Sequence, residues 1–282
     1  MVIIDGKALA QKVKERVKQR MAKISIRPGL GMILLGDHPA SKIYVFSKER
    51  ACIDMGFYVK TVILPTSISQ EKLFVEIKKL KRNSKIHGIL VQLPLPPGFD
   101  GEKVIEAIGY KKDVDCIHPF NIGQSISLGK VDLENLLVSC TVKGVVRLIE
   151  STKQSIAGKK AVVVGRSNLV GKPMAMLLLA KNATVTICHS KTQDLKKETK
   201  QADILVVAVG QPNLITADMV KKGAIVIDVG INRVRKRIVG DVDFKKVKKV
   251  AGYITPVPGG VGPMTIACLL ENTLLLAKRK EG

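Results

Sequence analysis

The stretch VVVGRSNLVGKP, residues 162–173, decides the fold. An apolar run that ends in glycine predicts a buried strand followed by a tight turn, and Gly171 and Pro173 suit the start of a helix packed closely on that strand. The N–H groups at such a helix start can bind a phosphate. Because Ser167 replaces the second glycine of the common G-x-G-x-x-G pattern, an ordinary strand–turn–helix without a ligand remains an alternative.

The next predicted strand, residues 184–188, indicates which nucleotide the turn would bind. In a fold that binds NAD, this strand usually ends in an acid that holds the ribose 2′-hydroxyl. Here it is followed by His189 and Ser190, and the first carboxylate is Asp194. Arg166 stands in the preceding turn, and a cation with hydroxyl groups suits a 2′-phosphate, which favours NADP over NAD. His189 fits a buried structural role equally well.

Apolar strand patterns alternate with helical patterns on both sides of this stretch. We expect strands at residues 31–36, 57–64, 87–92, 160–164, 184–188, 204–209 and 224–229, and helices at 5–25, 41–56, 69–83, 142–151, 173–182 and 264–280. Such alternation predicts an α/β fold with parallel sheets. Residues 110–130 show no period and predict a functional loop. A break near 141–158 predicts one domain over 1–141 and a Rossmann-like domain over 142–263, with the helix 264–282 packed back on the first.

Composition excludes some classes of protein and leaves the meaning of the charge open. The 282 residues are 46% hydrophobic, which permits large cores, and no apolar run is long enough to span a membrane. The net charge of +23 is compatible with nucleic-acid binding. The lysines are spread over many helices and aromatic residues make up only 4%, which favours a solvated basic surface. The charge could also attract anionic substrates.

The cysteines and histidines predict neither disulfides nor metal sites. Five cysteines and four histidines are widely spaced, without a Cys-x-x-Cys pair. The first ten residues, MVIIDGKALA, do not resemble a secretory signal. We therefore expect free thiols in a reducing, cytoplasmic compartment and no structural zinc.

Four polar residues are candidates for catalysis. Tyr44 and Lys48 are spaced i, i+4 on a predicted helix and share one face, where a ring and a cation could act together. Gln92 follows a buried-looking strand, at the end where parallel sheets bind ligands. Asp115 lies in the aperiodic loop. Read singly, each fits an ordinary structural role better, and no Ser-His-Asp arrangement or Walker phosphate loop is recognisable.

Six motifs occur in order along the chain. They are Tyr44-x-x-x-Lys48, VQLPLP (91–96), KDVD (112–115), GRS (165–167) with VGxP (170–173), CHSxT (188–192) and PVPGGVGPMT (256–265). Taken in this order, the motifs resemble those of the bifunctional methylenetetrahydrofolate dehydrogenase/methenyltetrahydrofolate cyclohydrolase family, and the similarity extends over essentially the whole chain. QLPLP and PGGVGPMT are the most diagnostic.

The resemblance implies a role for each candidate residue. Lys48 would assist proton movement during hydration of the methenyl bridge, Gln92 would tune Lys48, Tyr44 would stack on the folate ring, and Asp115 would hold the pterin edge. The cofactor-binding residues implied for NADP are Gly165, Arg166, Ser167, Ser190 and Ile231, of which Arg166 and Ser190 would contact the 2′-phosphate region. The loop residues implied to bind substrate are Pro258, Gly259 and Gly260.

The family's fold is two α/β domains, an N-terminal three-layer domain and a C-terminal Rossmann-like NADP-binding domain, with a cleft between them. The implied function is oxidation of 5,10-methylenetetrahydrofolate with NADP and hydrolysis of the product to 10-formyltetrahydrofolate, in one-carbon metabolism and purine biosynthesis. Implied partners are tetrahydrofolate derivatives, including polyglutamylated ones, and a second copy of the chain. A monofunctional dehydrogenase of the same family and a basic nucleic-acid-binding Rossmann protein are the alternatives.

Two departures from the family pattern are visible. Cys116 replaces a glycine after KDVD, and Ser139 and Val142 replace the two prolines of a Pro-Cys-Thr-Pro string. The first could alter the loop that carries Asp115, because glycine permits backbone angles that cysteine does not. The second could loosen the chain near the expected domain break.

Overall fold

The computed structural model describes residues 1–126, 132–235 and 237–281, and it divides the chain into two compact units. Unit 1 contains Met1–Lys12 and Gln124–Ala267, and unit 2 contains Val13–Gly123 and Cys268–Gly282. Three helices contribute to both units, namely α1 (Gly6–Met21), α5 (Pro119–Ile126) and α10 (Val261–Glu281).

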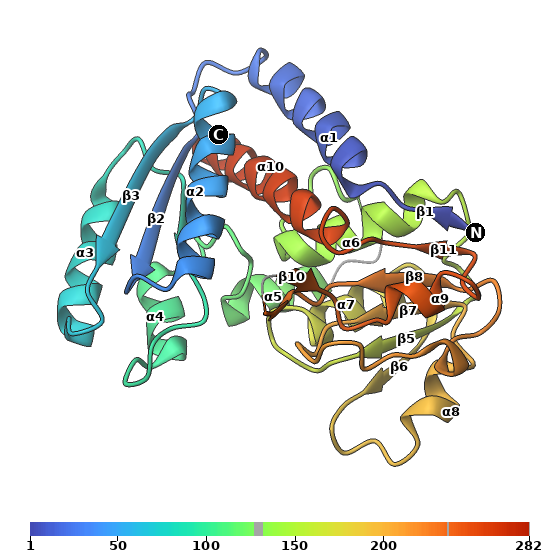
Figure 1. The fold of residues 1–282 in the computed structure, drawn as a ribbon. Helices are drawn as coiled ribbons and strands as arrows, with labels where there is room; N and C mark the ends of the chain where they lie inside the picture. Colours follow the sequence, from blue (N-terminus) through green and yellow to red (C-terminus); the bar gives the residue numbers. More distant parts are fainter. Residues whose placement is uncertain (127–131, 236, 282) are drawn as a thin grey trace. The chain divides into compact units, whose positions relative to one another are not determined.

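Unit 1 is built on a parallel sheet of six strands in the order β1-β11-β8-β7-β5-β6 (Figure 1). The strands are β1 (Val2–Ile3), β5 (Lys160–Val164), β6 (Thr184–Cys188), β7 (Ile204–Val207), β8 (Ile225–Asp228) and β11 (Tyr253–Ile254). The chain runs from β5 outward to β6 and then returns to β7 on the other side of β5. The carboxyl ends of β5 and β7 therefore form a topological switch point, where open α/β sheets bind their ligands.

Helices cover both faces of this sheet because its central strands are apolar on both sides. One face packs against α6 (Cys140–Ser151) and α7 (Gly171–Ala180). The other face supplies Val162, Leu205 and Val226 to a core shared with the remaining short elements. These are α8 (Leu195–Thr199), the 3-10 helix η1 (Ala217–Met219) and α9 (Phe244–Val247), while β9 (Asn232–Val234) and β10 (Arg237–Val239) form a separate antiparallel hairpin.

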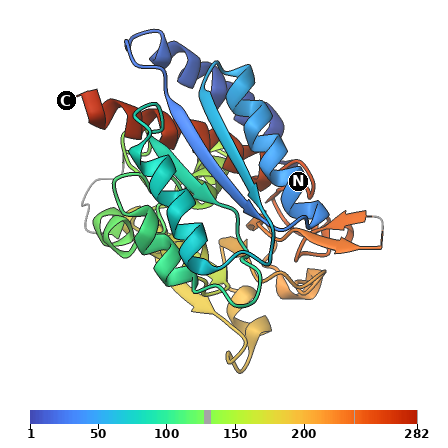
Figure 2. The ribbon, with the colours of Figure 1, turned by 90° about the vertical axis from the view of Figure 1, so that its left-hand side faces the viewer.

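Unit 2 contains a smaller parallel sheet in the order β3-β2-β4, and Figure 2 shows helices on both of its faces. The elements are β2 (Gly29–Leu35), α2 (Pro39–Asp54), β3 (Tyr58–Leu64), α3 (Gln70–Arg82), β4 (Gly88–Val91), α4 (Gly101–Ile108) and α5 (Pro119–Ile126). The central strand β2 is buried along its whole length. Its Ile33 and Leu35 pack with Leu73 and Ile77 of α3. A second switch point lies at the carboxyl ends of β2 and β4.

The expected fold class, two α/β domains with parallel sheets, is confirmed. Some local expectations were wrong. The segment expected to be an aperiodic loop contains α5, and α4 was not expected. The final helix begins at Val261 rather than at residue 264. Residues 127–130 of the expected loop lie outside the described residues. The domain boundaries drawn from the sequence stay predictions.

Candidate functional site

The side chains of Lys48 and Gln92 meet at the carboxyl edge of the unit 2 sheet. Lys48, on α2, is 9% exposed, and its Nζ donates a hydrogen bond to Gln92 Oε1 at 2.9 Å. Gln92 follows β4 directly, and its backbone N–H donates to Ile33 O of the neighbouring strand. Its Nε2 donates to Leu93 O at 2.7 Å, so the amide can present only its oxygen to the lysine. The structure thus brings together two of the predicted catalytic residues.

Tyr44 lies one turn before Lys48 on the same face of α2. It is half-buried, and burial raises the pKa of its hydroxyl above 10.0, so the phenol stays neutral at physiological pH. Cys52, one turn after Lys48, is fully buried, and burial and the Glu49 carboxylate raise the pKa of its thiol to about 12. This face of the helix therefore offers a neutral ring and the Lys48 amine, whereas the Cys52 thiol is protonated and unreactive.

The peptide before Asp115 runs alongside β4. Ile89 pairs with Asp113 in a parallel bridge, and Ile89 N–H donates to Lys112 O at 2.7 Å. Continuing that parallel register puts the half-buried Asp115 level with the carboxyl end of β4, which Gln92 follows. All four residues predicted for chemistry, Tyr44 included, therefore belong to one edge of the unit 2 sheet or to the helix that follows its central strand.

Asp113, two residues earlier, holds this peptide in place through hydrogen bonds to its buried carboxylate. It is 2% exposed, and its Oδ2 accepts hydrogen bonds from His118 N and Asn121 Nδ2. Burial raises the pKa of its carboxyl group above 3.8. Cys116, the residue that replaces the family's glycine, has a φ of 54°, so the chain keeps the left-handed conformation without the glycine. The sequence reasoning did not single out Asp113, although its place in the KDVD motif was visible.

The glycine turn of unit 1 closes tightly, as the sequence predicts. Gly165 has a φ of 126°, and a Cβ there would lie 2.3 Å from Ala208 O. A Cβ at Gly171 would lie 2.2 Å from Gly165 O, so the helix start presses directly on the turn. Ser167 Oγ accepts from Val170 N at 3.2 Å and stabilises the entry into α7. Its hydroxyl is thus engaged by the turn, while Arg166 is exposed.

The end of β6 lies next to this turn, because Gly165 N–H donates to Cys188 O at 2.8 Å. Ser190 is exposed there. His189 is half-buried, and its Nδ1 accepts from Lys191 N at 3.1 Å within a local turn. Asp194, the first acid after β6, caps α8 by accepting from Lys197 N at 3.0 Å. The Asp194 carboxylate is therefore occupied as the N-cap of α8. No described acid directly follows β6, where NAD-binding folds place the carboxylate that holds the ribose 2′-hydroxyl.

The other residues predicted for binding lie in two further loops of unit 1. Ile231 follows β8 and is 45% exposed, a large apolar side chain left in solvent at the carboxyl edge. Pro258, Gly259 and Gly260 follow β11 on the same edge. Gly260 is held close to the first helix of the chain, since a Cβ on Gly6 would lie 1.9 Å from Gly260 O. This edge can bind an extended, phosphate-bearing ligand across the switch point.

Two buried carboxylates at this edge were missed by the sequence reasoning. Asp228 is 3% exposed at the end of β8, and Asp241 is fully buried after β10. An acid at the end of a buried strand was the available signal for Asp228. Asp241 had none, because it stands in a polar stretch that resembles a loop.

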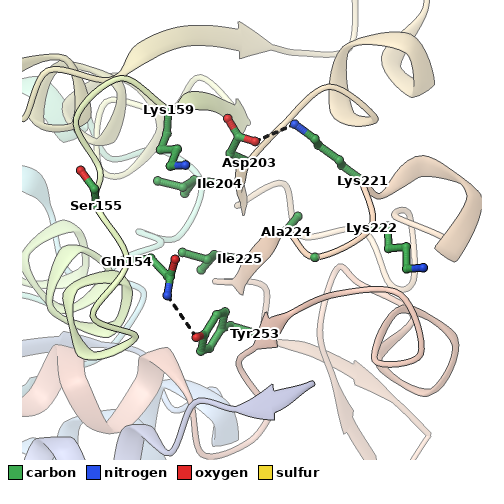
Figure 3. Close-up of a pocket in the computed structure, with 11 residues that line it drawn as sticks. Gln154, Ser155, Lys159, Asp203, Ile204, Lys221, Lys222, Ala224, Ile225 and Tyr253 are labelled. Atoms are coloured by element: carbon green, nitrogen blue, oxygen red, sulfur yellow. Dashed lines mark hydrogen bonds and ion pairs between the residues drawn. The ribbon is translucent and has the colours of Figure 1, made fainter.

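A small pocket of about 120 Å³ opens at the opposite, amino edge of the unit 1 sheet (Figure 3). Lys221 reaches across it to Asp203 at 2.7 Å, and Gln154 Nε2 lies 3.3 Å from Tyr253 Oη. The Asp203 carboxylate in this pocket is thus paired with Lys221, at the end of the sheet away from the glycine turn. Within the described residues, no group of histidine, cysteine, aspartate or glutamate side chains could hold a metal ion, and no helix is long and apolar enough to cross a membrane.

Comparison with known proteins identifies two family models along the chain. Residues 4–115 match the model of the tetrahydrofolate dehydrogenase/cyclohydrolase catalytic domain, and residues 139–281 match that of the NAD(P)-binding domain. The bifunctional protein FolD of Moorella thermoacetica is 53% identical over 98% of this chain and 99% of its own.

Two solved structures are similar over nearly the full length. The bifunctional FolD enzyme of Campylobacter jejuni is 48% identical, with a TM-score of 0.93 and 99% of both chains covered. The Trypanosoma brucei methylenetetrahydrofolate dehydrogenase-cyclohydrolase, solved with NADP cofactor and an inhibitor, is 39% identical with a TM-score of 0.95, covering 100% of this chain and 98% of its own.

Proposed function

Because this chain belongs to the tetrahydrofolate dehydrogenase/cyclohydrolase family, we propose that it is a bifunctional enzyme of one-carbon metabolism. It oxidises 5,10-methylenetetrahydrofolate to the methenyl compound with NADP, and then hydrolyses that product to 10-formyltetrahydrofolate. Two observations together support both steps: the part-buried contact between Lys48 and Gln92, 2.9 Å long, and the glycine-turn dinucleotide fold carried by the same chain.

The carboxyl edge of unit 1 fits NADP. The Gly165 turn has no room for a side chain, so it packs against Ala208 at the switch point and is followed there by the exposed Arg166. Arg166 and Ser190 are both exposed beside it and suit a 2′-phosphate, while Asp194 is committed to its helix. Gly165, Ser167 and Ile231 would line the rest of the cofactor. The T. brucei relative, whose structure contains NADP, supports this choice of nucleotide.

In the oxidation, NADP when bound accepts a hydride from the methylene carbon. The chain's part is to orient the substrate, which accounts for a large share of the barrier in such transfers. Tyr44 stacks on the folate ring and Asp115 holds the polar edge of the pterin. Pro258, Gly259 and Gly260 contact the substrate through a loop whose glycines admit a close approach.

In the hydrolysis, water adds to the cationic methenyl carbon and loses a proton. The bond from that carbon to N5 then breaks as N5 takes up a proton and the new hydroxyl loses one, which leaves the formyl group on N10. Lys48 stands in a desolvated position and moves the proton that the water loses. Gln92 fixes the lysine through one accepted hydrogen bond, and its other bond to Leu93 O prevents the amide from rotating. Gln92 is therefore placed to set both the position and the hydrogen bonding of the lysine.

Unit 2 also supports a homodimer. Ile43, Phe46 and Ile53 form an apolar stripe on α2, opposite the Lys48 face, and each is 47–60% exposed. Ile63 on the edge strand β3 is 49% exposed as well. Large apolar side chains gathered on one helix and a neighbouring edge strand are typical of a protein interface. A second copy of the chain is the proposed partner.

We also propose a reducing, cytoplasmic compartment. The five cysteines are buried and none forms a disulfide. Buried thiols without disulfides are typical of proteins kept under reducing conditions.

The function is tested with the purified full chain, methylenetetrahydrofolate and either NADP or NAD. Reduced cofactor and the methenyl compound are followed separately, and methenyltetrahydrofolate alone is supplied in a second assay. We expect reduction of NADP in preference to NAD, and decay of the methenyl compound faster than in buffer. No cofactor reduction with either nucleotide would refute the dehydrogenase step, and decay no faster than in buffer would refute the hydrolase step.

A further inference from the structure

A pair of buried carboxylates lies under the carboxyl edge of the unit 1 sheet. Asp228 ends β8, and its Oδ1 accepts from Gly230 N at 3.0 Å and from Asp241 N at 2.9 Å. Its Oδ2 accepts from Val242 N at 3.0 Å. These three bonds tie the turn after β8 to the segment that returns from the β9–β10 hairpin.

Asp241 extends the connection to the next strand. Its Oδ2 accepts from Val209 N at 2.7 Å and Gly210 N at 2.9 Å, in the turn after β7. Its Oδ1 accepts from Asn232 Nδ2 at 2.8 Å. A carboxylate is suited to this position because all three partners are donors and it is an acceptor only.

The chain leaves room for this pair at two glycines. A Cβ at Gly240 would lie 1.8 Å from Asp228 Oδ2, and one at Gly230 would lie 2.2 Å from the carboxyl carbon of Asp241. Burial, reinforced by the Asp241 carboxylate, raises the pKa of Asp228 to about 6. Removing two carboxylates from water costs free energy, and hydrogen bonds to the buried groups offset this cost. The pair is therefore a candidate for fixing a backbone geometry that the protein needs.

The turns that the pair fixes belong to the proposed cofactor edge. The turn after β7 begins at Ala208, whose carbonyl oxygen is the atom that a Cβ on Gly165 would meet. The turn after β8 contains Ile231. Asp228 N–H also donates to Thr255 Oγ1 at 2.8 Å, next to the loop that carries Pro258. One buried pair thus holds the two turns that follow β7 and β8, the neighbours of the Gly165 turn on one side of β5.

We propose that Asp241, supported by Asp228, is a positioning residue for NADP, which sets the turns after β7 and β8 against the Gly165 turn. It acts through the backbone and Asn232 rather than by touching the cofactor. The inference rests on the proposed function. It predicts that damage to the pair weakens NADP binding, whereas hydrolysis of supplied methenyltetrahydrofolate, which consumes only water, keeps its rate.

The test is a double-mutant cycle on Asp241 and Asn232. In Asp241→Asn, the new amide can point its NH₂ group at the NH₂ group of Asn232, where both are donors. In the other orientation its NH₂ group faces the N–H groups of Val209 and Gly210, which then lose their acceptor. Asn232→Asp puts two carboxylates opposite each other. The double variant exchanges the two groups, so the amide oxygen at 241 can accept from the turn while its NH₂ donates to the carboxylate at 232. Steady-state KM for NADP, methenyl hydrolysis and thermal unfolding are measured for the wild type and all three variants.

We expect each single variant to raise the KM for NADP by roughly 10- to 100-fold, the loss of a hydrogen bond to a charged group. The double variant should recover most of that loss, and hydrolysis should stay near the wild-type rate throughout. An unchanged KM in Asp241→Asn would overturn the proposal. So would a double variant as impaired as the singles, or a parallel loss of both activities with the melting temperature. Failure of the wild type to reduce NADP would instead refute the proposed function.

Discussion

At the scale of single residues, Cys116 carries the most strained backbone near the proposed folate site. Its φ of 54° costs a residue with a Cβ roughly 1–2 kcal/mol, and its side chain is 2% exposed. We expect Cys116→Gly to change the free energy of unfolding by less than about 1 kcal/mol, because relief of strain offsets the lost packing. Cys116→Val should be destabilised by about 2 kcal/mol or more, since β-branched residues avoid positive φ. Urea unfolding measures both, and equal stability of the two variants would contradict this account.

The ionisation of Asp228 makes the free energy of unfolding depend on pH. Its pKa is raised from 3.8 in the unfolded chain to about 6 in the folded one by burial and then by Asp241, so the folded state binds the proton more tightly. The stabilisation that comes from protonated Asp228 is fully present below about pH 4, and it is lost from the free energy of unfolding as the pH rises through about 6. Asp228→Asn does not titrate there. Between about pH 4 and pH 7.5, the wild type should lose about 3 kcal/mol of unfolding free energy relative to the variant. Parallel pH profiles of the two proteins would show the assignment to be wrong.

Single residues were also the least predictable part of the sequence. Tyr44, Lys48, Gln92 and Asp115 each fit a structural role when taken alone, because a contact such as Lys48 to Gln92 joins residues 44 positions apart. The sheet topology that joins them is not contained in any local pattern. Asp241 was missed for the same reason, since its partners come from three other segments.

At the scale of elements, the βα turn at Gly165 depends on two close backbone approaches. Gly171→Ala would put a Cβ 2.2 Å from Gly165 O and displace the turn or the helix. We expect affinity for NADP to fall by roughly 10- to 100-fold, because displacement of about 1 Å in a binding site has effects of this size. Equilibrium titration with NADP measures it. Gly123→Ala in α5 is the control, since nothing lies within 4 Å of its Cβ. Wild-type affinity in Gly171→Ala would contradict the proposed site.

The element scale is where the sequence was most informative. Runs of apolar and β-branched residues predicted every described strand of four or more residues, and the glycine after β5 predicted the turn at Gly165. The strands outside that prediction are β1, β9, β10 and β11, which have two or three residues each and are too short to show a period. The helix α5 was missed because its sequence, PFNIGQSI, contains proline, asparagine and glycine, which favour turns.

At the scale of the whole molecule, the apolar stripe on α2 predicts self-association. Phe46→Glu should convert a dimer to monomers, because a charge buried in an apolar interface costs several kcal/mol, of the order of such an interface's surplus affinity. Sedimentation equilibrium measures the mass. Val75→Glu on α3, also an exposed apolar position at 51%, should leave the dimer intact. A monomeric wild type, or a dimeric Phe46→Glu variant, would refute the proposed interface.

We propose that one chain carries both reactions and that Lys48 serves the second. The most direct test compares Lys48→Ala with the wild type, supplying methenyltetrahydrofolate and following its decay, with NADP titrated into the same preparations. We expect decay in the variant to fall to the rate in buffer while NADP binds with wild-type affinity. Hydrolysis at the full wild-type rate would contradict it.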